Sequence, residues 1–71
     1  MEQLVTIFSA LSDPSRLRIL LLVRRLELSV GELAAVLGQS QPRVSRHLKI
    51  LADTGLVERA REGAWVFVRL G

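Results

Sequence analysis

Four polar side chains lie close together in the second half of the chain. They are Gln41, Arg43, Ser45 and Arg46. In duplex DNA a glutamine amide can form two hydrogen bonds with adenine and an arginine two with guanine, while a serine hydroxyl tolerates several partners. A solvated helix face carries the same residue types. The pattern therefore indicates base contact only if the segment is helical and anchored on its other side.

The segment from residue 40 to 51, SQPRVSRHLKIL, contains an apolar stripe at helical spacing, which predicts a buried side. The stripe consists of Val44, Leu48 and Leu51. Ser40 is a preferred N-cap residue and Gly55 a preferred stop, so we expect one helix that runs to about Thr54. Its first turns reach base edges when such a helix enters a DNA groove, and they carry the polar side chains.

A second helix is predicted immediately upstream. Ser29 and Glu32 form an S-x-x-E capping box, in which each side chain binds the other residue's backbone amide, so this helix should begin at Val30. Gly38 should end it in a left-handed conformation. Its apolar stripe is expected to consist of Leu33, Val36 and Leu37. Two helices joined by a few residues that include glycine form a helix-turn-helix, here over residues 30–54.

After residue 55 the spacing of apolar residues changes from helical to alternating, which predicts a β-hairpin. Its strands are residues 56–61 and 64–70, and they are expected to meet at Glu62 and Gly63. The second strand is apolar on both faces. Val66, Val68 and Leu70 share one face, and Trp65 and Phe67 share the other. A strand covered on one side normally alternates, so we expect something outside this chain to cover the second face.

Four further side chains are placed for contact with the DNA backbone or the minor groove. Arg59 and Arg61 on the first strand could put a guanidinium beside a minor groove, although a charged edge strand also discourages association between sheets. Lys49 and Ser40 are placed for phosphates, the serine because it lies at a helix N-terminus. Trp65 could stack on a base, but packing is the more common role of such a residue.

The first half of the chain predicts two more helices. Residues 2–10 form a short amphipathic helix, and Asp13 with Pro14 starts another that runs to about Leu26. We expect this second helix to turn inward Leu17, Leu20 and Leu21, with Ile19 or Val23, and to turn outward Arg16, Arg18, Arg24 and Arg25. On the first helix, the sequence leaves open whether the apolar residues serve a dimer interface or fold back on the second helix. These residues are Leu4, Ile7 and Phe8.

The composition limits the classes of function. A chain of 71 residues is one small domain with no room for a deep active site, and the absence of cysteine excludes disulfides and thiolate metal ligation. His47 has no second ligand nearby, so we expect no metal and a histidine that orients its helix through a hydrogen bond to backbone or phosphate. Neither a glycine-rich phosphate loop nor a nucleophile with its base is present, so we expect no enzyme and no cofactor.

Charge and hydropathy favour a polyanionic partner and no membrane. Ten Lys and Arg against seven Asp and Glu give a net charge of +3. The longest apolar run, residues 19–23, is too short to cross a bilayer, and no signal-peptide pattern opens the chain. We expect a cytoplasmic protein.

Three segments together resemble the ArsR/SmtB family of bacterial winged-helix regulators. FSALSDPSRLRILLLV is similar to the family's opening, SVGELAAVLGQSQPRVSRHLKILADTGLV to its helix-turn-helix, and REGAWVFVRL to its wing. The resemblance covers nearly the whole chain, and SQPRVSRHLKIL is its most specific part. It implies a homodimeric transcriptional repressor that leaves its operator when an effector binds.

Two departures limit what the resemblance implies. Arsenic-sensing members carry two cysteines in the segment that matches ELSVGEL, where this chain has Ser29 and Gly31. Other members sense metals through a final helix, which also forms much of the dimer interface, and this chain stops at the wing. We therefore expect the N-terminal domain of a longer protein. In some relatives a similar domain precedes a methyltransferase-like domain that would bind S-adenosylmethionine, and the resemblance implies such a fusion as an alternative for this chain.

The sequence thus predicts a mainly α fold with a small β-hairpin: a winged helix-turn-helix of four helices and a two-stranded wing, residues 56–70, in a single domain, residues 1–71. The predicted function is sequence-specific binding of double-stranded DNA as a repressor. The alternatives are a protein-interaction module whose basic face is incidental and a complete small-molecule or metal sensor. The predicted DNA contacts are Ser40, Gln41, Arg43, Ser45, Arg46, Lys49, Arg59 and Arg61.

Overall fold

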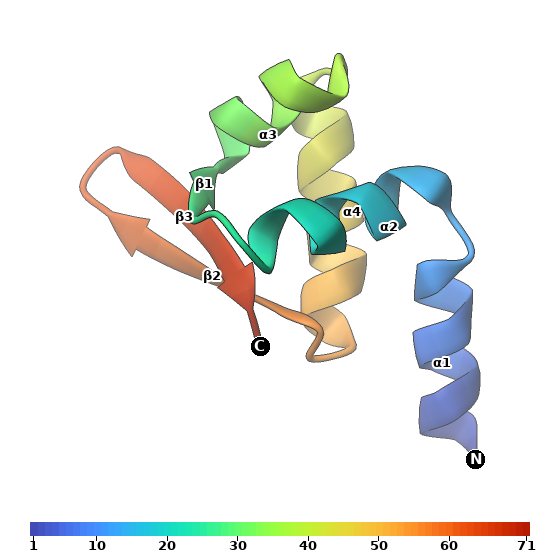
Figure 1. Cartoon of the computed structure of the whole chain (residues 1–71). Coiled ribbons are helices and arrows are strands. Elements are labelled where there is room, and N and C mark those ends of the chain that lie inside the picture. The colour runs from blue at the N-terminus through green and yellow to red at the C-terminus, as the bar shows by residue number, and fades with distance from the viewer.

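Four helices and three short strands make up the computed structural model, which describes residues 1–71 (Figure 1). In chain order they are α1 (Glu2–Leu11), α2 (Pro14–Val23), β1 (Leu28–Ser29), α3 (Val30–Leu37), α4 (Gln41–Asp53), β2 (Val57–Glu62) and β3 (Trp65–Leu70). Helices α2, α3 and α4 form the body, the hairpin of β2 and β3 lies against one side, and α1 stands at the opposite edge. No helix has the length and apolar character needed to span a bilayer.

The expected winged-helix architecture is confirmed, with one added strand. The sheet is antiparallel in the order β1-β3-β2, and β1 pairs Leu28 with Val68 and Ser29 with Phe67. The sequence analysis missed β1 because two residues are too few to show an alternating pattern. The hairpin turn lies one residue later than expected, since Glu62 still pairs with Trp65.

Helix α4 supplies the centre of the core. Val44, Leu48 and Leu51 are all fully buried, which confirms the predicted stripe. They pack with apolar residues from every other helix and from both strands of the hairpin. The remaining buried members of this cluster are Ala10, Ile19, Val23, Leu33, Ala34, Val57 and Val68.

The predicted inward faces of α2 and α3 were partly wrong. Leu17 and Leu21 on α2 are 45% and 58% exposed, and Val36 on α3 is 61% exposed. Helix α2 buries both Ile19 and Val23, one turn apart, which the sequence analysis had offered as alternatives. The run ILLLV is apolar on every side of a helix, so its spacing does not indicate which side is buried. Helix α2 also ends at Val23, three residues before the expected end.

The start of α2 was predicted correctly. The Asp13 carboxylate accepts hydrogen bonds from the backbone amides of Ser15, at 2.8 Å, and Arg16, at 3.3 Å. Partial burial acts to raise the pKa of Asp13, but these two hydrogen bonds, with the nearby guanidinium of Arg16, hold that pKa below its ordinary value. The negative charge is therefore favoured in the folded state.

The buried stripe of α4 predicts a large difference between two truncations. Leu48→Ala removes a fully buried side chain and should lower the free energy of unfolding by about 3 kcal/mol. Val36→Ala removes a mostly exposed one and should change it by less than about 0.5 kcal/mol. Urea unfolding followed by circular dichroism measures both, and equal losses would contradict the observed orientation of α3.

The pKa of Asp13 predicts a pH-dependent contribution to stability. Because the folded-state pKa lies below the ordinary value of 3.8, the carboxylate stabilises the fold above that pH and the effect disappears as the pH falls through the lowered pKa. Asp13→Asn keeps an acceptor for the cap but removes the charge. Its melting temperature should lie below that of the parent chain at pH 6 and converge on it toward pH 2. A constant difference across this range would contradict the role of the charge.

Candidate nucleic-acid interface

The turn between α3 and α4 fixes where α4 begins. Gly38 ends α3 with a φ of 66°, a left-handed conformation that glycine adopts without strain. Ser40 then caps α4, with its hydroxyl oxygen accepting from the Arg43 amide at 3.3 Å. Gln39, which the sequence analysis did not single out, donates its side-chain amide to the Ser15 hydroxyl on α2 at 2.7 Å. The turn is therefore tied to α2 as well as capped.

The outer side of α4 presents the expected polar residues to solvent. Its exposed members are Gln41, Arg43, Ser45 and Arg46. None of these side chains forms a hydrogen bond or an ion pair within the chain, in which Lys49–Asp53 is the one salt bridge. All four are therefore free to bind an external partner.

Two predicted phosphate-contact residues already have partners. The Lys49 ammonium lies 3.1 Å from the Asp53 carboxylate, one turn further along α4, and both side chains are more than 60% exposed. An exposed pair of this kind contributes little stability, so a phosphate can compete for the ammonium. The Ser40 hydroxyl accepts from the Arg43 amide, but as a donor it is still free.

A groove separates α4 from the hairpin, and three predicted site residues line it. They are Ser45 from α4 and Arg59 and Arg61 from β2. Because side chains alternate along a strand and Val57 is buried, Arg59 and Arg61 point to the same side as Val57, toward α4. The structure thus brings the hairpin arginines and the polar side of α4 onto one surface.

The amide of Gln41 lies close to the backbone at the start of α3. A Cβ atom added to Gly31 would stand 3.2 Å from Gln41 Nε2, which is tighter than an ordinary contact. Gly31 is one of the positions at which the arsenic-sensing pattern has cysteine. The glycine therefore leaves room for the glutamine at the edge of the candidate interface.

Arg16 connects three helices, contrary to the expectation that it faces solvent. Its Nε donates to the Ala10 carbonyl and its Nη2 to the Ser9 carbonyl at the end of α1, while Nη1 lies 3.3 Å from His47 Nδ1 on α4. A guanidinium only donates, so Nδ1 is the acceptor in this contact. His47 was expected to bond backbone or phosphate, and its partner is an arginine instead. Hydrogen-bond partners this far apart in the sequence produce no local sequence pattern, so the sequence analysis did not predict them.

A family model and several relatives match this chain. The model described as "Bacterial regulatory protein, arsR family" matches residues 13–59. The arsenical resistance operon repressor of Escherichia coli is 45% identical over 67 residues, which cover 93% of this chain and 57% of the relative. The transcriptional repressor SmtB homolog of Synechocystis is 44% identical over 69 residues, or 97% of this chain and 52% of the relative. The chain spans about half the length of these curated relatives.

Solved structures agree with the sequence matches. Reduced HlyU from Vibrio cholerae superposes with a TM-score of 0.91 at 38% identity, over 99% of this chain and 74% of that one. The homodimeric winged helix-turn-helix DNA-binding domain from Mycobacterium bovis gives 0.91 at 33% identity, over 97% and 64%. The fold, the matched family model and the sequence identities agree, and the chain belongs to the arsR family of bacterial regulatory proteins.

Proposed function

We propose that this chain binds duplex DNA as the DNA-binding domain of a transcriptional repressor, with α4 in the major groove. One observation carries the proposal: four polar side chains of α4 (Gln41, Arg43, Ser45 and Arg46) are exposed and without partners in the chain, while the apolar stripe of the helix is fully buried. A helix held in this way presents hydrogen-bonding groups at a fixed orientation, which the reading of base edges requires.

Different parts of the interface have different roles in this proposal. Gln41, Arg43, Ser45 and Arg46 contact base edges. Ser40 and Lys49 contact phosphates, which set the position of the helix but carry no sequence information. Arg59 and Arg61 approach the neighbouring groove or its backbone from the hairpin. The Escherichia coli and Synechocystis relatives are named as repressors, which supports the same role here. The domain would belong to a longer chain and would lack a thiolate metal site.

We further propose that α1 forms a homodimer interface. Leu4, Val5 and Phe8 are 53%, 61% and 68% exposed, so they do not fold back on α2, and α1 stands apart from the body (Figure 1). Only Ala10, near its end, is buried. The Mycobacterium bovis domain is described as homodimeric. A two-fold dimer would read two half-sites about one helical turn apart.

The division between base and phosphate contacts predicts two different mutant phenotypes. The operator is first obtained by selection from random duplexes. Arg46→Ala should then weaken operator binding by about 1–3 kcal/mol while leaving random duplex nearly unchanged, because a lost base contact relaxes specificity. Lys49→Ala should weaken both equally and reduce the salt slope by about one. Fluorescence anisotropy at several salt concentrations measures both quantities.

A matched control for this experiment is Arg25→Ala, which removes the same charge from an exposed position after α2. It should change neither the specificity ratio nor the salt slope appreciably. Equal losses on operator and random DNA for Arg46→Ala would exclude a base-reading role for that residue. No binding of any duplex at low salt would overturn the proposed function and favour a protein-interaction module.

The exposed apolar side of α1 predicts the position of the dimer interface. Phe8→Glu places a charge where the two copies would meet, so the dimer should dissociate at least about tenfold more readily. Leu21→Glu is the matched control, since this leucine is similarly exposed but lies on α2. Sedimentation equilibrium measures both variants. If only Leu21→Glu dissociated the dimer, the interface would lie on α2 and not on α1.

A further inference from the structure

The two faces of the hairpin carry opposite chemistry. Strand β2, VERARE, turns Arg59 and Arg61 toward α4, so its alternate residues occupy the other side. Cross-strand pairing places the corresponding residues of β3 beside them. We call this second side the outer hairpin face. It consists of Glu58, Ala60, Glu62, Trp65, Phe67 and Arg69.

An aromatic pair forms the centre of the outer hairpin face. The ring centroids of Trp65 and Phe67 are 6.5 Å apart, with 29° between the ring planes. Phe67 is half-buried, whereas Trp65 is 61% exposed. The sequence analysis expected this side of β3 to be covered from outside the chain, and no segment of residues 1–71 covers the tryptophan. Tryptophan is enriched at binding interfaces, so the exposed ring marks a candidate site.

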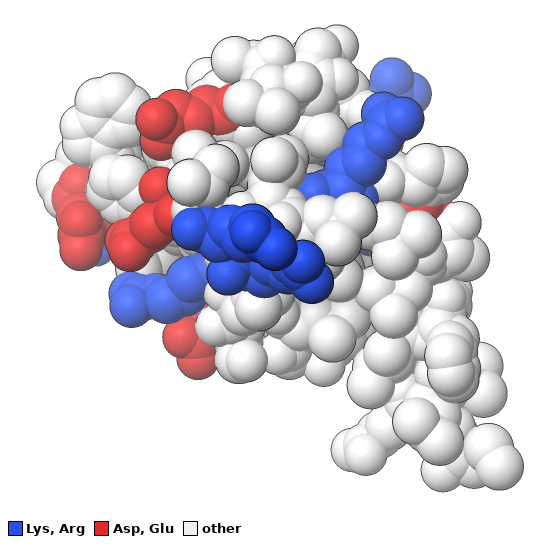
Figure 2. All heavy atoms as spheres, in the orientation of Figure 1, with Lys and Arg blue, Asp and Glu red and all other residues white.

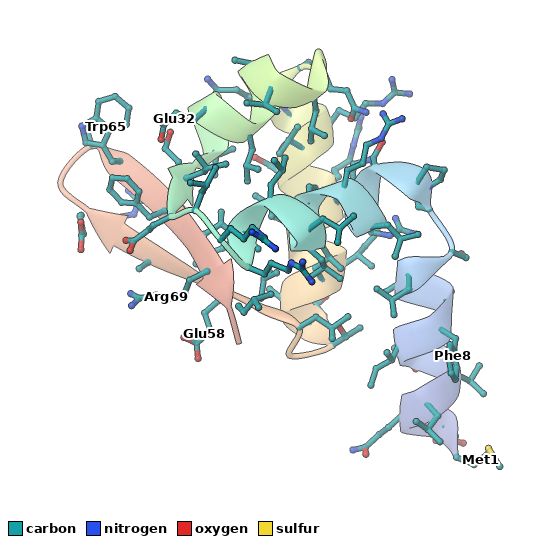
Figure 3. All side chains as sticks on the ribbon, in the orientation of Figure 1. Met1, Phe8, Glu32, Glu58, Trp65 and Arg69 are labelled. Atoms are coloured by element: carbon teal, nitrogen blue, oxygen red, sulfur yellow. The ribbon has the colours of Figure 1, made fainter.

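Carboxylates surround the aromatic pair. Glu62 is the cross-strand partner of Trp65. Glu32 reaches the same area from α3, because its Oε1 accepts from the Ser29 amide at 2.8 Å and Ser29 is the cross-strand partner of Phe67. Figure 3 shows the Glu32 and Trp65 side chains both at the hairpin end of the molecule.

These carboxylates are not neutralised within the chain. Glu58 pairs with Arg69 across the strands, yet no ion pair joins them, since the chain's one salt bridge is on α4. Figure 2 shows several acidic groups at this end of the molecule, with basic groups next to them. Within the outer hairpin face and Glu32, three carboxylates stand against the one guanidinium of Arg69. The patch is acidic on a chain whose net charge is +3.

We propose that the outer hairpin face docks a cationic peptide segment of a partner protein. An arginine of that segment stacks on the exposed ring of Trp65 and pairs with the carboxylate of Glu62, while apolar neighbours cover Phe67. Cations bind the face of a tryptophan ring more strongly than the faces of other aromatic rings. A guanidinium can stack on such a ring and at the same time form an ion pair with a carboxylate. The carboxylates repel the like-charged DNA backbone, and the proposal does not depend on the function of α4.

Trp65 makes the proposal directly measurable, because it is the only tryptophan in the chain and gives a single indole N–H signal in an NMR spectrum. The probe is a capped hexapeptide of alternating leucine and arginine, added to the 71-residue chain. The indole signal and the amides of β2 and β3 should shift and saturate at millimolar or lower concentration. A capped leucine–glutamate hexapeptide should cause no shift. Equal responses to the two peptides, or no response to the first, would overturn the proposal.

Two variants test the chemistry of the site. Glu62→Gln should weaken binding of the leucine–arginine peptide by about threefold, whereas Glu2→Gln, which removes the same charge from the exposed start of α1, should leave it unchanged. Trp65→Leu should weaken it by about two- to fivefold, measured from the β2 amides. Melting temperatures establish that each variant is folded. Equal effects of Glu62→Gln and Glu2→Gln would show that peptide binding depends only on the net charge of the chain. That result would overturn the assigned site.

A last comparison separates a peptide segment from a lone guanidinium. Arginine amide, supplied at the same guanidinium concentration as the peptide, should bind at least about threefold more weakly, because it cannot cover Phe67. Equal affinity would show that the face recognises a single cation and would overturn the assignment to a peptide.

Discussion

The rotation of α4 about its own axis is the constraint on which the candidate interface depends. Val44, Leu48 and Leu51 are fully buried, so turning the helix by one residue would expose them and bury an arginine without a partner. Burial of an unpaired charge costs several kcal/mol, about as much as a small domain has in reserve. The same apolar packing that stabilises the fold therefore also decides which side chains meet a partner.

Polar contacts made by α2 then fix α4 along its length. Ser15 accepts from Gln39 just before α4 begins, and Arg16 contacts His47 near its middle. Arg16 also binds carbonyls at the end of α1. Helix α2 carries no proposed DNA contact, yet it connects the exposed helix α1 to the helix that we propose reads the bases. Through this one guanidinium, the end of α1 and the middle of α4 are bonded to the same side chain.

Local signals were predicted well and non-local ones were not. The ends of α3 and α4 followed from Ser29, Gly38 and Ser40, because a cap acts within three or four residues of itself. The buried side of α2 did not follow, since its sequence is apolar all round. The bonds of Arg16 span six and 31 residues, and no spacing rule reaches that far. For the candidate site, the sequence correctly predicted that the polar side chains of α4 are exposed. The groove that Ser45 shares with the hairpin arginines could be found only from the three-dimensional structure.

The register of the hairpin matters as much as the rotation of α4. In VERARE the two arginines lie on one face and the two glutamates on the other, so a slip of one residue would replace Arg59 and Arg61 by Glu58, Ala60 and Glu62 on the side that faces α4. A two-residue turn with Gly63 at a φ of 60° holds the register, because β2 and β3 must pair from Glu62 and Trp65 onward. Alternation along one strand thus gives the hairpin a basic side that faces α4 and an opposite side that is acidic and aromatic.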